Sequence, residues 1–483
     1  MHSVPKVRAA ALAAVVASVF LSGCQTAGTQ GTRDPRQAEA SNMQLVGYND
    51  LQARSAYQPV IHQQGGRWIA YVGHHGGAAR NPMTGQEELN GTSIVDVTDP
   101  KNPKYLHHIP GAKPAGAQMV RVCNGADLPK GDRGKVYMLR SLGNIAHEVW
   151  DVTAPEKPRK VSTVVEKLKG THKSWWECDT GIAYLVSGVP EWRSDRMTQI
   201  FDLSDPARPV LIRNWAVAGQ EPGASGKPPV FRQHGPISTG PKGNRVYFGY
   251  GTVSNGLIQI VDREKLLNGP REPTAQNQLY PLVAQVETPP YMGAHTTLPV
   301  LGMQVADLAK YTGPKAGPRH RDILVVVNES TSNECLEPRQ MVYFMDITNE
   351  KTPFTIANFD VPEAPHNFCS RGGRFGAHAS NENMPPMYAK RIVFISWFNA
   401  GVRAVDIRDP YKPREIAYYI PATTDKTDRR CVKTAEGERC KVAIQTNNVE
   451  VDDRGYIYIV DRANTGMHVL ELTGDARAVA DFR

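Results

Sequence analysis

The fold is decided by the stretch Ile94-Val95-Asp96-Val97-Thr98-Asp99-Pro100, which a second proline follows at Pro103. The phrase recurs with variations along the rest of the chain, and the acids at its third position are Asp96, Asp151, Asp202, Asp262, Asp346, Asp406 and Glu471. Successive acids lie 51 to 84 residues apart. Seven copies at such a spacing predict a repeat architecture.

Each copy has the pattern of a small β-sheet. An apolar run that is rich in β-branched and aromatic residues precedes the phrase, for example at residues 68–72 and 182–186. The prolines then forbid helix and turn the chain, and another alternating segment follows, as at 105–109. The 42 glycines and 36 prolines argue against helical repeats, and a β-helix would need a shorter period. We therefore predict an all-β fold, a seven-bladed β-propeller with about four short strands per blade.

The repeated phrase resembles the LVIVD repeat of exported bacterial β-propellers. The resemblance covers roughly residues 45–475 and is specific for the fold. It implies no activity, because one fold hosts many functions. We expect the recurrent aspartate to accept hydrogen bonds from turn amides rather than to bind metal.

The first 23 residues have the pattern of a secretory signal, with Lys6 and Arg8 before an apolar run that is too short to span a bilayer comfortably. The run ends in Leu21-Ser22-Gly23-Cys24, which resembles the bacterial lipoprotein signal. That resemblance implies a palmitate-type lipid anchor on Cys24, and Gln25 in place of Asp favours the outer membrane. We predict a signal peptide at 1–23, a flexible tether at 24–42 and the propeller at 43–483, in an exported protein whose membrane contact is its lipid.

Six cysteines remain besides Cys24, and an even number in an exported chain suggests three disulfides. Six cysteines allow fifteen connectivities, of which we favour pairing in chain order. The expected pairs are Cys123–Cys178, Cys335–Cys369 and Cys431–Cys440. No CxxC spacing supports the rival interpretation, a cysteine-ligated metal.

Charge and motifs exclude several function classes. The net charge of +8 is spread along the chain, so nucleic acid is not expected as a partner. The sequence contains no G-x-S-x-G, no P-loop, no H-E-x-x-H and no G-x-G-x-x-G after a strand.

Histidines supply the strongest functional signal. The inner strand of each blade lines the central channel, and in four consecutive blades its start holds one of the fourteen histidines, namely His172, His234, His295 and His378. The equivalent positions are Gln118 in the second blade, Asn447 or Asn448 in the seventh, and His62 or Gln58 in the first. Converging imidazoles suit a single Cu, Fe or Zn ion. The alternative is a hydrogen-bonded polar plug or an organic-ligand site.

Further residues are candidates for supporting roles. Those expected to orient a metal-bound histidine are His366, Glu177, Glu329 and Glu450. Arg371 and Arg374, on a glycine-rich loop, are candidates for binding an anionic substrate. Of Trp175 and Trp176, one is expected to face the channel and the other the blade interior, either as core packing or with one ring as a stacking wall for a substrate.

Two histidine pairs lie elsewhere. His74-His75 is similar to the His-His dipeptide of the selenium-binding protein and methanethiol oxidase family, seven-bladed proteins with a His-bound copper, although the surrounding residues depart from that family's pattern. His107-His108 is expected at the surface.

The sequence leaves several functions open. The chain is either a membrane-anchored protein that binds a ligand or a partner protein at its channel mouth, or a His-ligated copper or iron oxidoreductase acting on a small molecule. A purely structural role at the cell surface is the third possibility.

Overall fold

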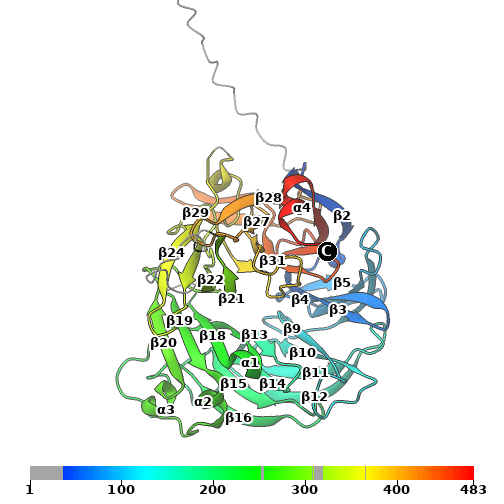
Figure 1. Cartoon of the computed structure of the whole chain (residues 1–483). Coiled ribbons are helices and arrows are strands. Elements are labelled where there is room, and N and C mark those ends of the chain that lie inside the picture. Colours follow the sequence, from blue (N-terminus) through cyan, green and yellow to red (C-terminus); the bar gives the residue numbers. More distant parts are fainter. Residues whose placement is uncertain (1–35, 252–254, 307, 309–318, 365, 483) are drawn as a thin grey trace, which may run out of the picture. The chain divides into compact units, whose positions relative to one another are not determined.

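A computed structural model describes residues 36–251, 255–306, 308, 319–364 and 366–482. The predicted seven-bladed β-propeller is confirmed. Six four-stranded sheets and one five-stranded sheet surround a central channel (Figure 1). The predicted signal peptide, Cys24 and most of the tether lie outside the described residues.

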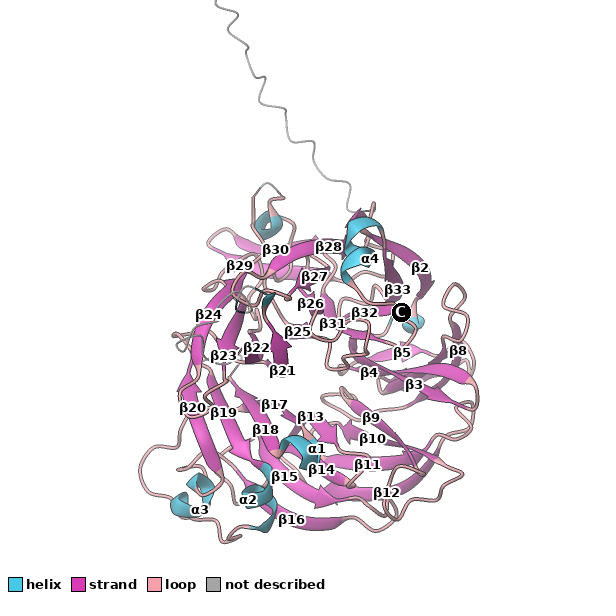
Figure 2. Cartoon of the chain, viewed as in Figure 1, coloured by secondary structure: helices cyan, strands magenta, loops and turns pink. Residues whose placement is uncertain are grey.

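Each blade is an antiparallel sheet, and in blades 1 to 5 the four strands follow chain order from the channel outward (Figure 2). Blade 1 consists of β3 (Ala56–Gln64), β4 (Arg67–His74), β7 (Thr92–Asp96) and β8 (Lys104–Ile109). Blade 2 consists of β9 (Val120–Asn124), β10 (Val136–Leu142), β11 (Ala146–Asp151) and β12 (Arg159–Glu166). Blade 3 consists of β13 (Gly170–Trp176), β14 (Ile182–Gly188), β15 (Met197–Asp202) and β16 (Val210–Trp215).

The remaining blades follow the same plan. Blade 4 consists of β17 (Gln233–Ser238), β18 (Arg245–Tyr250), β19 (Leu257–Asp262) and β20 (Leu282–Glu287). Blade 5 consists of β21 (Thr296–Gln304), β22 (His320–Val327), β23 (Val342–Asp346) and β24 (Phe354–Phe359). Blade 6 contains β25 (Ala379–Ser380), β26 (Ile392–Ser396), β27 (Val402–Asp406) and β28 (Arg414–Ile420), and blade 7 contains β31 (Thr446–Val451), β32 (Ile457–Asp461) and β33 (Met467–Leu472).

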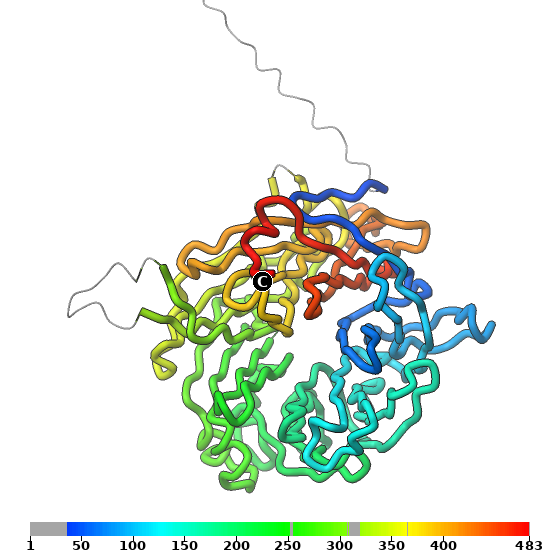
Figure 3. The backbone as a smooth tube through the Cα atoms, turned by 45° about the vertical axis from the view of Figure 1, so that its right-hand side comes forward, coloured from blue at the N-terminus to red at the C-terminus, as the bar shows by residue number. Residues whose placement is uncertain are grey.

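The N-terminal segment completes the last two blades. β1 (Glu39–Ser41) pairs with β28 as a fifth strand of blade 6, and β2 (Met43–Asn49) pairs with β33 as the fourth strand of blade 7. In Figure 3 the blue N-terminal segment accordingly lies beside the red C-terminal strands. The sheet structure therefore begins at Glu39 rather than at the predicted boundary of 43, because the edge of β28 offers backbone groups for pairing.

The hydrophobic core lies between neighbouring blades. Val325 and Phe344 of blade 5 pack with Ile395 and Trp397 of blade 6, for example, and all four are fully buried. The inner strands contact one another around the whole ring, from β3 through β25 to β31 and back to β3. The ring is therefore closed by packing between blades.

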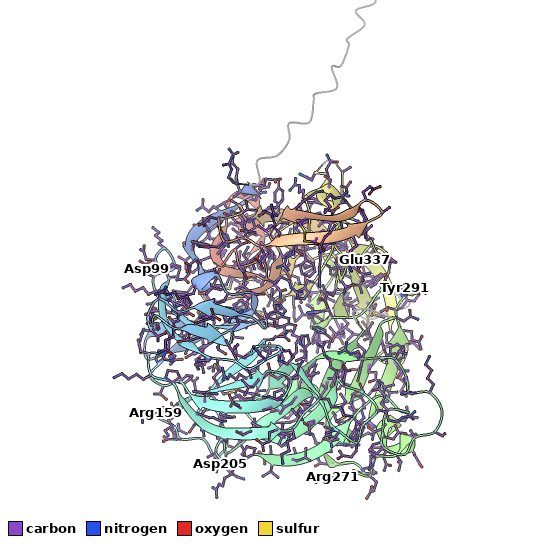
Figure 4. All side chains as sticks on the ribbon, turned by 180° about the vertical axis from the view of Figure 1, so that it is seen from behind. Asp99, Arg159, Asp205, Arg271, Tyr291 and Glu337 are labelled. Carbon is purple, nitrogen blue, oxygen red and sulfur yellow. A yellow bond between two sulfur atoms is a disulfide. The ribbon has the colours of Figure 1, made fainter. Side chains whose placement is uncertain are left out.

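The recurrent aspartate has the structural role expected of it. Its carboxylate accepts a hydrogen bond from the amide two residues later in the turns at Asp96, Asp151, Asp202, Asp346 and Asp406. In blade 4, Asp262 instead caps α2 (Arg263–Asn268) by accepting from the Lys265 amide. The second aspartates of the phrase, Asp99 and Asp205, lie at the outer rim, as Figure 4 shows.

Few additions decorate the blades. In the described residues they include the hairpins β5 (Ala78–Arg80) with β6 (Glu87–Leu89) and β29 (Arg429–Thr434) with β30 (Gly437–Val442), and the short helices α1 (Gly240–Gly243), α3 (Ala275–Leu279) and α4 (Gly474–Val479). Among the helices of the described residues, none is both long and apolar enough to cross a membrane. The predicted disulfides are confirmed as Cys123–Cys178, Cys335–Cys369 and Cys431–Cys440.

Candidate functional site

The inner strands all begin at one end of the channel, which we call the histidine end. Because neighbouring strands of a blade are antiparallel and each blade has four, the chain is back at the same end of the channel when the next inner strand begins. For the same reason, loops that join the second and third strands of a blade also lie at the histidine end. Residues from either kind of segment can meet there, although they are far apart in sequence.

Backbone irregularities place side chains at the start of the inner strands. The register shifts between Ala56 and Gln58, between Thr171 and Ser174, between Gln233 and Gly235, and between Thr446 and Asn448. The residues inside these shifts include Tyr57, His172, His234 and Asn447. Such bulges bend a strand and redirect a side chain.

The four predicted histidines meet in the channel and form what we call the histidine cluster. Ring centroids are 4.3 Å apart for His172 and His234, 3.6 Å for His234 and His295, and 4.2 Å for His295 and His378. Their exposed fractions are between 0 and 5%. The Tyr57 hydroxyl completes the cluster at 3.2 Å from Nε2 of His172 and 3.5 Å from Nε2 of His295.

Hydrogen bonds at Nδ1 hold three of the four imidazoles with Nε2 inward. Nδ1 of His378 donates to the backbone carbonyl of Asn447, and Nδ1 of His172 donates to the side-chain oxygen of Gln118, at 2.6 Å. His295 uses Nδ1 on the Thr296 hydroxyl, at 2.8 Å. A neutral imidazole whose Nδ1 carries the proton keeps its lone pair on Nε2. Nε2 of His172 therefore accepts a hydrogen bond from Nε2 of His234 at 2.7 Å, and Nδ1 of His234 has no hydrogen-bond partner among the described residues.

Glu329 supplies a carboxylate to the cluster. Its oxygens lie 3.9 Å from Nε2 of His234 and 3.6 Å from Nε2 of His378. Single donor atoms of His234, His295 and Glu329 all lie within 4.8 Å of one another. Two imidazole nitrogens and a carboxylate oxygen, with further imidazoles beside them, are a donor set that suits Zn, Cu or Fe.

Electrostatics favour the ligating form of the histidines. Burial, and then neighbouring positive charges, lower the pKa of all four imidazoles well below the usual value, so they are neutral at pH 7. Burial raises the pKa of Glu329, although Arg374 and Arg462 oppose this shift. Neutral imidazole is the form that binds a metal.

A layer of charged side chains, which we call the ionic layer, lies one step further along the inner strands. Glu382 pairs with both Lys173 and Arg121, and Gln58 donates to it at 3.2 Å. Burial alone would raise the pKa of Glu382, but the charges of Lys173 and Arg121 outweigh it and lower the pKa to about 2. Burial, followed by the charge of Glu382, raises the pKa of Glu450 to about 8.

A cavity of about 350 Å³ lies on the far side of the ionic layer. Its walls include Val60, His62, Arg121 and Trp175, and the Arg121 guanidinium lies 4.5 Å from the Trp175 ring centroid. Trp175 thus faces the channel mouth while Trp176 packs in the core between blades 2 and 3, as the alternation predicts.

The supporting residues predicted from sequence fall in different places. Glu329 and Arg374 lie at the histidine cluster, and Arg374 contacts Glu329 at 3.1 Å. Glu450 belongs to the ionic layer, where its carboxylate accepts from the amides of Glu382 and Asn383.

Three other predicted positions lie away from the cluster. Glu177 forms an ion pair with Arg263 at 2.6 Å. Arg371 binds Glu39 of β1 at 2.9 Å, and His366 lies 3.8 Å from the same carboxylate. None of the three contacts a channel histidine, because each is held by a partner on its own side of the molecule.

Two expectations about individual residues are corrected. The first-blade position belongs to Tyr57 and not to His62 or Gln58, because the nine-residue β3 is longer than the neighbouring inner strands and displaces the count. The Gly65-Gly66 turn joins β3 to β4 and sets a register in which Ala56 pairs with His74. Counting back from this turn identifies Tyr57 as the residue at the start of the inner strand. His108 is buried and not at the surface, since the β5–β6 hairpin covers it and Glu88 binds its Nδ1 at 2.7 Å.

The His74-His75 pair divides between two environments. The His75 ring lies 5.1 Å from that of Tyr57, and its Nδ1 accepts from Gln118 at 3.0 Å, so it borders the histidine cluster. His74 is buried inside blade 1 with Nε2 at 2.7 Å from the Ser93 hydroxyl. Gln118 therefore links His75 to His172.

Comparisons with known proteins give no family for the chain. No protein-family model matches the sequence, and no curated protein matches it. Two crystal structures of Sqt1 from Chaetomium thermophilum are similar in structure at 9% identity. One has a TM-score of 0.47 over 89% of this chain and 98% of Sqt1, and the other a TM-score of 0.45 over 91% and 100%.

Proposed function

We propose that the chain is an exported lipoprotein of the LVIVD-repeat kind that binds a small molecule at the histidine end of its channel, with one transition metal held by the histidine cluster. The observation that carries the proposal is the inward convergence of four buried, neutral imidazoles beside Glu329. His234, His295 and Glu329 would hold the ion, with His172 and His378 beside them. Copper, iron and zinc fit this donor set.

A second candidate function is that of a metal-dependent oxidoreductase. It is favoured by the position of the donors in a channel whose other end is blocked by the ionic layer, so that a small molecule would approach the ion from one side only. A bound copper or iron ion would supply the redox chemistry. Tyr57, through its hydroxyl, would help to position the rings of His172 and His295.

The metal is tested by elemental mass spectrometry on the full chain, extracted from membranes without a metal-affinity tag. We expect about one Cu, Fe or Zn per chain, and its loss in His234→Ala and His295→Ala. His320→Ala is the matched control, because His320 is exposed at the start of β22 and outside the channel. Circular dichroism verifies that each variant is folded.

A chain that stays metal-free after each of the three ions is added would contradict the metal proposal. The cluster would then be a polar plug or an organic-ligand site. A metal that survives His234→Ala would place the ion elsewhere. Copper or iron would lead to redox assays, whereas zinc alone would remove the oxidoreductase candidate.

A further inference from the structure

Three arginines from different blades converge on the mouth of the histidine end. Arg196 lies in the loop between β14 and β15, Arg374 in the segment before β25, and Arg462 in the loop between β32 and β33. All three segments belong to the kinds that reach the histidine end. We call these residues the arginine rim.

Contacts tie the rim to the histidine cluster. The guanidiniums of Arg374 and Arg462 lie 3.1 and 3.9 Å from the same oxygen of Glu329, and 5.3 and 6.0 Å from the Phe398 ring centroid. The Phe398 ring is 4.8 Å from that of His378. The backbone carbonyl of Arg196 accepts from the Gln233 amide, next to His234. After burial, the Arg196 charge is the largest cause that lowers the pKa of His172.

The rim has more positive charge than its surroundings balance. Within the part of the chain that the structure describes, the Arg196 guanidinium has no hydrogen bond or ion pair, and the one ion pair of the Arg462 guanidinium is its 3.9 Å contact with Glu329. Burial also lowers the pKa of both guanidiniums. A partly buried charge without a partner lowers the stability of the folded protein unless a ligand or water binds to it.

The rim is accessible, whereas the cluster beneath it is not. The side chains of Arg374 and Arg462 keep 22% and 20% of their surface exposed, in contrast to the buried histidines. A molecule that entered the histidine end would therefore meet the guanidiniums first. Their planar forks match the oxygens of carboxylates and phosphates.

We propose that Arg196, Arg374 and Arg462 bind the oxyanion group of a small molecule and place the rest of it against the histidine cluster. The inference rests on the proposed ligand site in the channel but does not depend on its metal. Glu329 pairs most closely with Arg374, at 3.1 Å, which leaves Arg196 and the more distant Arg462 to bind the anion. The same charges repel cations.

Isothermal titration calorimetry of the full chain with succinate, inorganic phosphate or sulfate tests the inference. We expect at least one anion to bind, with an affinity that falls as salt is added. Arg462→Met and Arg196→Met should each weaken binding at least tenfold, because a charge-assisted hydrogen-bond partner is lost. Arg371→Met is the matched control, since Arg371 is paired with Glu39 outside the channel.

The outcomes separate this inference from the metal proposal. A preference for succinate identifies a carboxylate as the bound group, and a preference for phosphate identifies a phosphate. Either preference supports anion binding by the arginine rim. Anion binding that persists in metal-free His234→Ala protein, with metal content unchanged in Arg196→Met, supports the rim independently of the ion. If none of the three anions binds at millimolar concentration, or if both rim variants bind like Arg371→Met, the inference is overturned.

Discussion

At the scale of single residues, the channel contains two polar layers of different chemistry. The histidine cluster is neutral and its nitrogens converge, whereas the ionic layer consists of paired charges. Lys173 follows His172 directly in the chain but belongs to the other layer, since its side chain extends from blade 3 to Glu382 of blade 6. Gly235 leaves room for it, because a Cβ there would lie 3.0 Å from the Lys173 side chain.

Removing Lys173 should therefore destabilise the protein. Both Lys173 and Glu382 have side chains that are only 2% exposed, and Lys173→Met leaves a buried carboxylate short of one partner. We expect a loss of roughly 3–5 kcal/mol in the free energy of unfolding, measured by urea denaturation. Lys169→Met is the control, since Lys169 is exposed just before β13.

A double-mutant cycle shows whether the pair itself is responsible. Lys173→Met with Glu382→Gln should cost at least about 1 kcal/mol less than the two single changes added together. Strict additivity, or a single-variant loss no larger than that of Lys169→Met, would contradict a coupled pair in the channel.

At the scale of elements, the N-terminal segment determines whether the ring is complete. β2 pairs with β33 from Met43↔Leu472 to Asn49↔Met467, and Met43 enters the core next to Leu470 and Leu472. Without β2, blade 7 has three strands and β33 becomes an exposed edge. Exposed edges promote association between chains.

Two truncations test this element. A chain without residues 1–49 should unfold about 10 °C lower than one without residues 1–35, and should form oligomers on size exclusion, because it loses the paired strands β1 and β2 and the core contacts of Met43. Both are to be exported behind the same signal peptide so that the disulfides form. Equal melting temperatures would show that β2 is dispensable for closure.

At the scale of the whole molecule, the two ends of the channel differ. The histidine end has the arginine rim and two of the three disulfides. It also has Arg371, which binds Glu39 of the first strand, β1. The opposite end has the cavity beside Trp175 and the Cys123–Cys178 bridge. The ionic layer lies between them, so each end is a separate site.

The proposed lipid anchor is a property of the whole molecule. Cys24→Ser should move the protein from the membrane fraction to the soluble fraction and abolish labelling with radioactive palmitate, because the acyl chains are what hold it at the bilayer. The Cys431→Ser and Cys440→Ser double variant is the control and should stay in the membrane. A wild-type chain that takes up no label would contradict the anchor.

The repeated phrase and its spacing were enough to predict the propeller, its seven blades and the turn role of the aspartate, and the even number of cysteines taken in chain order predicted the disulfide pairs. Strand alternation and turn chemistry are local properties, and repetition multiplies a weak local signal. The same repetition made the four histidines recognisable, because they occupy one position in successive copies.

The tertiary structure alone decided which other residues join them. Tyr57 lies in a register shift at the start of β3, while Arg196, Phe398 and Arg462 lie in loops that share no pattern. Lys173 and Glu382 are 209 residues apart, and β2 closes a blade with strands from the other end of the chain. Contacts of this kind depend on how the blades close into a ring, which no local pattern of residues encodes.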